Sequence, residues 1–144
     1  MENQKRSAIE KKKRALKRYK KISERISQLE ERLESLSEKI TSVRSPNLSG
    51  MPRGSKPISI ADLISDKKEL EERIERLKNK KGVLKREIIA EIDSLEDPRY
   101  CEILEAFFID LKTMDDIADE QGYTVRHTYR LYTKCVILLA EKSL

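Results

Sequence analysis

Side chains that suit nucleic-acid recognition recur over residues 124–134, which read TVRHTYRLYTK. An arginine guanidinium can donate two hydrogen bonds to a guanine edge, and lysine or tyrosine side chains can reach phosphate oxygens or a thymine methyl. On this chemistry Arg126 and Arg130 are the candidates for guanine contacts, and Tyr129 and Lys134 for phosphate or thymine contacts. The full candidate DNA-binding set is Thr124, Val125, Arg126, His127, Tyr129, Arg130 and Lys134.

Two short helices must position these side chains. Thr113, with Asp116 three residues later, has the capping-box spacing that starts a helix, and Thr124 can cap the next one. Gly122 falls between them, where the chain has to turn sharply through a conformation that glycine tolerates. Two helices joined by such a turn form a helix-turn-helix, which lays its second helix in the DNA major groove. A helical corner in a protein that never contacts DNA has the same pattern, so that interpretation stays open.

The second of these helices is expected to be amphipathic. Thr128, Leu131, Cys135 and Leu138 recur at helical spacing and can face the core. Thr128 is the weakest core member because its hydroxyl needs a partner, such as the carbonyl one turn back. Asp97 followed by proline predicts the start of a further helix, so a three-helix bundle is expected over residues 97–143.

Upstream, apolar residues alternate at spacings of four and three, the heptad pattern of helices that pair along their length. A segment rich in proline and glycine, residues 44–58, separates two such seams and forbids one continuous helix. The sequence predicts an all-α fold, with an antiparallel coiled-coil hairpin over residues 1–95 and a helix-turn-helix domain over residues 96–144. Pairing of the seams between protomers is the competing arrangement. The seam residues are Ile22, Ile26, Leu29, Leu33, Leu36, Ile40 and Val43, then Leu63, Leu70, Ile74, Leu77, Leu84, Ile88 and Leu95.

Charge is unevenly distributed, although the net charge of +5 is modest. Residues 1–21 contain ten Lys or Arg against two acids, whereas residues 91–120 contain eleven acids against two cations. A hairpin returns the basic segment to the end of the second arm, where it can contact phosphate. A merely solvated face and neutralisation of the acidic segment are the alternatives. The candidate phosphate contacts are Lys11, Lys12, Lys13, Arg14, Lys17 and Arg18.

Catalytic and metal-binding patterns do not accompany these features. The sequence contains no nucleophile elbow, phosphate loop or carboxylate–histidine site, so we expect neither an enzyme nor a cofactor. Cys101, Cys135 and His127 are too few and too separated for a zinc site or a disulfide framework, and both cysteines are expected to be buried. No apolar run is long enough to span a bilayer, so we expect a cytoplasmic protein with no membrane partner.

Several segments resemble a known family: SPNLSGMPRGSKP at 45–57, ISDKKELEERI at 64–74, LEDPRYCEIL at 95–104 and DDIADEQGYTVRHTYRLYTKCVILL at 115–139. They resemble the small phage-encoded transcriptional regulators of Gram-positive bacteria, the ArpU/RinA-like late-gene activators. The C-terminal part is also similar to the promoter-binding helix-turn-helix of sigma factors, their region 4. The resemblance implies a sequence-specific DNA-binding regulator of phage late genes, such as those for packaging and lysis, in the cytosol of a bacterial host.

Partners and alternatives follow from the size of the expected DNA-binding domain. One small helix-turn-helix reads few base pairs of double-stranded DNA, so we expect a homo-oligomer, in the simplest case a dimer, or a partnership with host RNA polymerase. The loop cations Arg44, Arg53 and Lys56 are candidates for an interaction with DNA, polymerase or another protomer. A phage DNA-packaging adaptor similar to a small terminase subunit, and a coiled-coil interaction protein, are the alternative functions.

Overall fold

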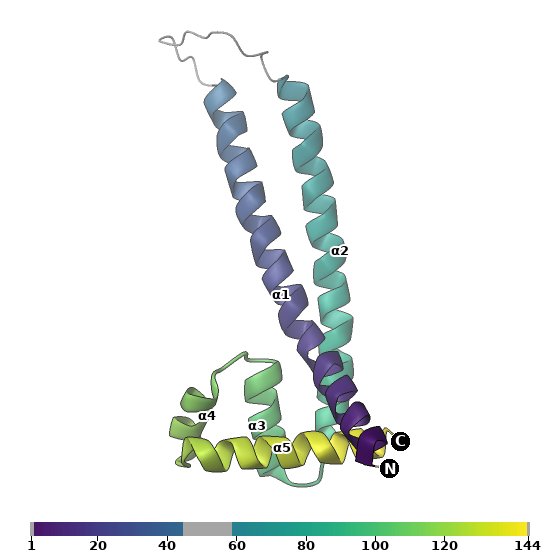
Figure 1. Cartoon of the computed structure of the whole chain (residues 1–144). Helices are drawn as coiled ribbons and strands as arrows, with labels where there is room; N and C mark the ends of the chain where they lie inside the picture. Colours follow the sequence, from purple (N-terminus) through teal and green to yellow (C-terminus); the bar gives the residue numbers. More distant parts are fainter. Residues whose placement is uncertain (1, 45–58, 144) are drawn as a thin grey trace. The chain divides into compact units, whose positions relative to one another are not determined.

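The computed structural model describes residues 2–44 and 59–143, and every regular element in those residues is an α-helix (Figure 1). α1 spans Glu2–Arg44 and α2 spans Ile60–Asp93. Three shorter helices follow: α3 at Pro98–Phe108, α4 at Met114–Gln121 and α5 at Val125–Lys142. The expected all-α class is thus confirmed. The candidate loop residues Arg53 and Lys56 lie outside the described residues, and Arg44 is placed only as the last residue of α1.

The chain divides into two compact units, and both long helices contribute to each. Unit 1 comprises residues 1–22 and 81–144, and unit 2 comprises residues 23–80. Unit 1 therefore contains the start of α1 and the end of α2 together with the three shorter helices. The boundary expected between residues 95 and 96 does not separate these units, because α1 and α2 share a core with α3, α4 and α5.

In unit 2, α1 and α2 lie side by side and run in opposite directions (Figure 1). An ion pair between Lys78 Nζ and Glu30 Oε1, 3.9 Å apart, joins the two helices. The predicted seam does not extend to Val43, which is exposed. Leu33, Leu36 and Leu77 are half-buried. The heptad spacing correctly predicts burial at the remaining positions of this unit, because side chains there return to the same face of each helix. The buried seam residues of this unit are Ile26, Leu29, Ile40, Leu63, Leu70 and Ile74.

The core of unit 1 draws on all five helices. Leu16 and Tyr19 of α1 are buried in the same cluster as Ile88 and Ile92 of α2 and the apolar faces of the shorter helices. Three short helices alone would enclose only a small core, so the long helices complete it. The shorter helices and the links between them contribute Ile103, Leu104, Ala106, Phe108, Ile109, Met114, Ile117, Leu131, Tyr132, Cys135, Val136 and Leu139.

Local signals start the shorter helices where the sequence predicts. Asp97 Oδ1 accepts a hydrogen bond from the Arg99 backbone N–H at 2.9 Å, and proline occupies the first turn of α3. Thr113 Oγ1 accepts from the Asp116 backbone N–H at 3.1 Å, which caps α4. The reciprocal bond of a full capping box, in which the Asp116 carboxylate accepts from the Thr113 backbone N–H, is not formed among the described residues. The threonine alone therefore caps this helix.

Candidate nucleic-acid interface

A tight turn joins α4 to α5. Gly122 has φ 73° and ψ 28°, the left-handed conformation that glycine adopts without a Cβ clash. The Gly122 amide donates to the Asp119 carbonyl at 3.3 Å, and the Tyr123 amide donates to the Ala118 carbonyl at 2.9 Å. These bonds satisfy carbonyls at the end of α4, and the predicted turn at Gly122 is confirmed.

The first turn of α5 is fixed by two threonines. Thr124 Oγ1 accepts from the His127 backbone N–H at 3.1 Å, which is the predicted cap. Thr128 is completely buried, and its hydroxyl donates to the Thr124 carbonyl at 3.0 Å, as the sequence also predicts. This arrangement buries one face of α5 and sets the direction in which the intervening side chains point.

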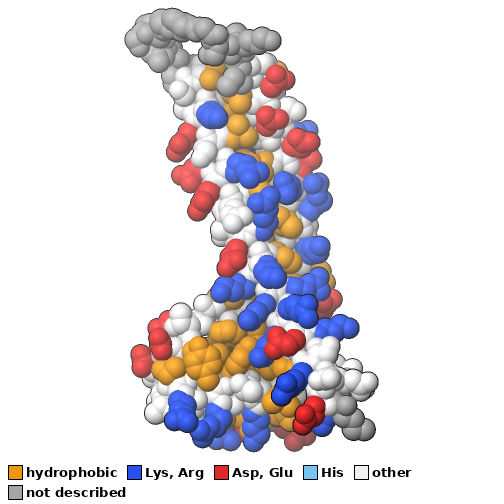
Figure 2. Space-filling view, viewed as in Figure 1, with side chains coloured by type: hydrophobic (Ala, Val, Ile, Leu, Met, Phe, Trp, Pro, Cys, Tyr) orange, Lys and Arg blue, Asp and Glu red, His pale blue; other side chains and the backbone are white. Residues whose placement is uncertain are grey.

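The opposite face of α5 is open to solvent. Arg126, Arg130 and Lys134 are exposed, and Tyr129 is 52% exposed. At 3.6 residues per turn these four positions fall within about 140° of the helix circumference. Arg126 and Arg130 form no ion pair or hydrogen bond with any residue that the structure describes. Figure 2 shows Lys and Arg side chains gathered along this helix.

The other candidates on α5 contact neighbouring side chains. His127 is half-buried, and its ring packs edge-on against Tyr123 with centroids 5.0 Å apart. Lys134 Nζ lies 5.7 Å from the centre of the Tyr100 ring on α3, close enough for attraction between the cation and the aromatic face. Val125 is exposed at the start of the helix. Arg126 and Arg130 therefore remain the two least constrained cations of the predicted set.

Two further residues belong near this face but were missing from the sequence-based set. Thr133 is exposed three residues after Arg130, so helical spacing alone could have identified it. Arg99 is the second residue of α3. Its guanidinium binds the Asp97 carboxylate through Nε–Oδ1 and Nη2–Oδ2 contacts of 3.2 and 2.9 Å. The hydrogen bond from Arg99 lowers the pKa of Asp97. Sequence spacing could not place Arg99, because its position depends on how α3 packs against α5.

The basic segment of α1 belongs to the same compact unit as α5. Ile9 of α1 and Ala140 of α5 line one small cavity. Lys12 is not a free phosphate contact, because its Nζ lies 2.6 Å from Glu91 Oε1 and its side chain is only 12% exposed. In the structure Lys12 therefore joins α1 to α2 and neutralises one residue of the acidic segment. The cations of the predicted set that remain exposed are Lys11, Arg14, Lys17 and Arg18.

Lys13 is intermediate between these two cases. Its side chain is 28% exposed, and its Nζ lies 3.8 Å from Glu10 Oε1, one turn earlier on α1. A pair at that spacing on a helix surface contributes only a few tenths of a kcal/mol, so Lys13 can exchange its partner for a phosphate.

Neither cysteine is placed to act as a nucleophile or ligand. Cys135 is fully buried, and burial raises the pKa of its thiol to about 12. Cys101 is half-buried, and its Sγ lies 3.4 Å from the Ile92 carbonyl oxygen. Within residues 2–44 and 59–143, no group of three or more His, Cys, Asp or Glu side chains is arranged to hold a metal ion. No helix in those residues is long and apolar enough to cross a membrane.

Comparisons with known proteins add no relative to this description. The chain matches no protein-family model, no curated protein and no solved structure. The functional assignment therefore depends on the exposed face of α5 and on the chemistry that its side chains offer.

Proposed function

We propose that this chain is a sequence-specific, DNA-binding transcriptional regulator. In this proposal α4, the turn at Gly122 and α5 form a helix-turn-helix, and α5 enters the major groove. The single observation that carries the proposal is that Arg126, Tyr129 and Arg130 share an exposed face of a helix whose other face is buried in a core. Arginines without protein partners keep all their donors available for base edges.

The exposed cations divide into two roles. Arg126 and Arg130 are the base-reading residues, because a guanidinium can bind a guanine edge through two hydrogen bonds. Lys134 and the exposed cations of α1 contact phosphate, which adds affinity without sequence information. α4 carries Asp115 and Asp116 in its first turn, so a duplex approaches α5 from the side away from these carboxylates.

We also propose the finer architecture that the sequence predicts, in which α1 and α2 form a coiled-coil hairpin and the protein is a dimer on paired half-sites or a partner of host RNA polymerase. The resemblance to phage late-gene activators extends the proposal to the control of packaging and lysis genes. Burial of the heptad positions along both long helices supports the hairpin.

Selection of bound duplexes from a random pool tests the proposal directly. An enriched sequence motif is the expected result, and its symmetry reports the number of protomers on the DNA.

Arg130→Ala should weaken binding to the selected site by about 1–3 kcal/mol, roughly fivefold to 150-fold, and leave non-specific binding nearly unchanged. Arg86→Ala is the matched control, since Arg86 is an exposed arginine on α2. Equal loss on all sequences would make Arg130 a phosphate anchor, and absence of any enriched motif would reject sequence-specific recognition.

The role of the α1 cations is tested by the salt dependence of DNA binding. Deletion of the basic segment is unsuitable, because Leu16 is 1% exposed and lies in the core of unit 1. Replacing Lys11, Arg14, Lys17 and Arg18 by glutamine retains the helix and removes four charges. Each lost phosphate contact should reduce the slope of log K against log salt by about 0.9. An unchanged slope would assign these cations to a solvated face.

The same preparation separates the alternatives. A packaging adaptor similar to a small terminase subunit is expected to form large rings, which light scattering distinguishes from a dimer. A coiled-coil interaction protein is expected to bind no DNA fragment even at low salt, where electrostatic binding is strongest.

A further inference from the structure

α2 carries a stripe of opposite charges within unit 2. Asp66, Glu69, Arg73 and Arg76 follow one another at spacings of three, four and three residues. They fall within a sector of about 80° of the helix circumference. The two acids come first and the two arginines second, so the stripe has an acidic end and a basic end.

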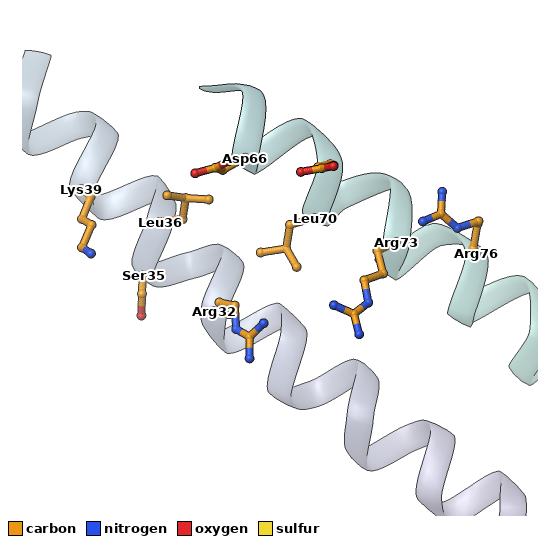
Figure 3. A pocket seen from close by; sticks show the side chains of 9 residues that line it. Arg32, Ser35, Leu36, Lys39, Asp66, Leu70, Arg73 and Arg76 are labelled. Atoms are coloured by element: carbon orange, nitrogen blue, oxygen red, sulfur yellow. The ribbon is translucent and has the colours of Figure 1, made fainter. Parts of the chain in front are cut away.

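The stripe lines a groove of about 590 Å³ between α1 and α2 (Figure 3). Leu36 of α1 and Leu70 of α2 point toward one another in this groove. Two cations of α1, Arg32 and Lys39, also line it. None of the four stripe residues forms an ion pair or hydrogen bond with any residue that the structure describes. Their charges are therefore available to a partner.

The stripe is complementary to its own copy in the antiparallel direction. Asp66 lies five residues before position 71 and Arg76 five after it, while Glu69 lies two before and Arg73 two after. When two helices pack antiparallel, residues equally far from the crossing point face one another. One register therefore aligns both acid–arginine pairs, and a two-fold axis generates each pair twice.

We propose that this groove is the surface on which a second copy of the chain packs, with α2 against the antiparallel α2 of its partner about an axis near position 71. Leu70 lies next to that axis, so the apolar residues of the two grooves meet. The unpaired hairpin leaves apolar seam surface uncovered, since Leu36 and Leu77 are only half-buried. Figure 2 shows a stripe of hydrophobic side chains between the two helices of this unit. A second hairpin covers these hydrophobic side chains, and the two hairpins together form a four-helix arrangement.

A second copy fits the groove better than a nucleic-acid backbone does. Phosphates would meet Asp66 and Glu69 in the same stripe as the arginines, and like charges repel. A copy of the chain satisfies both ends at once. The inference names a surface for the dimer proposed above and concerns unit 2 alone. It does not require that α5 bind DNA, so a failure of DNA binding and a failure of this interface are distinguishable.

Charge reversal followed by mixing tests the interface without DNA. One variant carries Asp66→Arg and Glu69→Arg, and the other carries Arg73→Glu and Arg76→Glu. Each variant alone places like charges opposite one another, which should weaken self-association by at least about tenfold. An equimolar mixture restores all four attractive pairs, as does a single chain that carries all four changes. Sedimentation equilibrium measures association against the monomer mass of 16.8 kDa, and circular dichroism verifies that each variant remains helical.

The control variant carries Lys68→Glu and Glu75→Lys, which keep the net charge and lie roughly 120–140° around α2 from the stripe. Association like that of the wild type is expected for this control. Dimers for the wild type, loss in each double variant and recovery in both the mixture and the four-fold variant support the proposal. A wild-type chain that remains monomeric at micromolar concentrations overturns it. So does a dimer that tolerates the reversed charges, because its interface must then lie elsewhere.

Discussion

Substitution of alanine for Gly82 and for Gly122 is expected to change the free energy of unfolding in opposite directions. Both glycines lie in unit 1. Gly82 lies inside α2, and Gly122 ends α4 with φ 73°. A Cβ built on either residue meets no atom within 4 Å, so steric contacts do not contribute at either position. Only the backbone conformation distinguishes the two.

The magnitudes follow from that conformational difference. Gly82→Ala should stabilise the fold by about 0.5–1 kcal/mol, because alanine loses less backbone entropy in a helix. Gly122→Ala should destabilise it by about 1 kcal/mol. The left-handed conformation costs an L-residue roughly 1–2 kcal/mol, and part of this is offset because alanine lowers the conformational entropy of the unfolded chain. The two variants should therefore differ by about 2 kcal/mol, close to thirtyfold in the unfolding equilibrium.

Urea unfolding followed by circular dichroism measures both variants. For a dependence of 1–3 kcal/mol per molar urea, typical of small proteins, the midpoints should move by roughly half a molar in opposite directions. Gly122→Asn is a useful control, because asparagine tolerates the left-handed region and should lose less stability than alanine. A neutral or stabilising Gly122→Ala would show that the turn between α4 and α5 does not have the geometry described above.

Three further predictions test the surroundings of the interface. The pKa of Asp97 is lowered in the fold, so its carboxylate stabilises the native state above about pH 4 and loses that effect as the pH falls. Asp97→Asn keeps a capping side chain, and its free energy of unfolding should depend less on pH in the acid range than that of the wild type. Thr128→Ser keeps the hydroxyl but removes a buried methyl, and should lower the unfolding free energy by about 1 kcal/mol in urea titrations. A thiol reagent at pH 8 should modify half-buried Cys101 at least about tenfold faster than fully buried Cys135, measured by mass spectrometry of peptides; equal rates would contradict the packing of α5.

Much of the helical framework could be predicted because its signals are local. A threonine or aspartate cap, a proline in the first turn and a glycine at the end each act on the backbone within one turn. Thr113, Gly122 and Thr124 therefore occupy the places expected for them. The exposure of Arg126 and Arg130 also follows from local information, because helical periodicity assigns them to the face opposite Thr128.

Contacts between distant segments could not be assigned in the same way. A heptad seam repeats every seven residues, so the sequence allows several registers between the long helices. Only one of them places Lys12 beside Glu91, and only the packing of α3 brings Tyr100 beneath Lys134. For the same reason the sequence could suggest neutralisation of the acidic segment but could not name the residue involved.

Burial of Leu16 in one cluster with Leu139 has a consequence for biosynthesis. A ribosome releases the first turns of α1 long before the helix that covers them exists, and the Lys12–Glu91 bridge alone joins residues 79 positions apart. Until α5 has been synthesised, the nascent polypeptide exposes the apolar residues of α1 that α5 later helps to bury. Contacts between such distant segments form slowly in folding, and molecular chaperones can engage the chain before these contacts form.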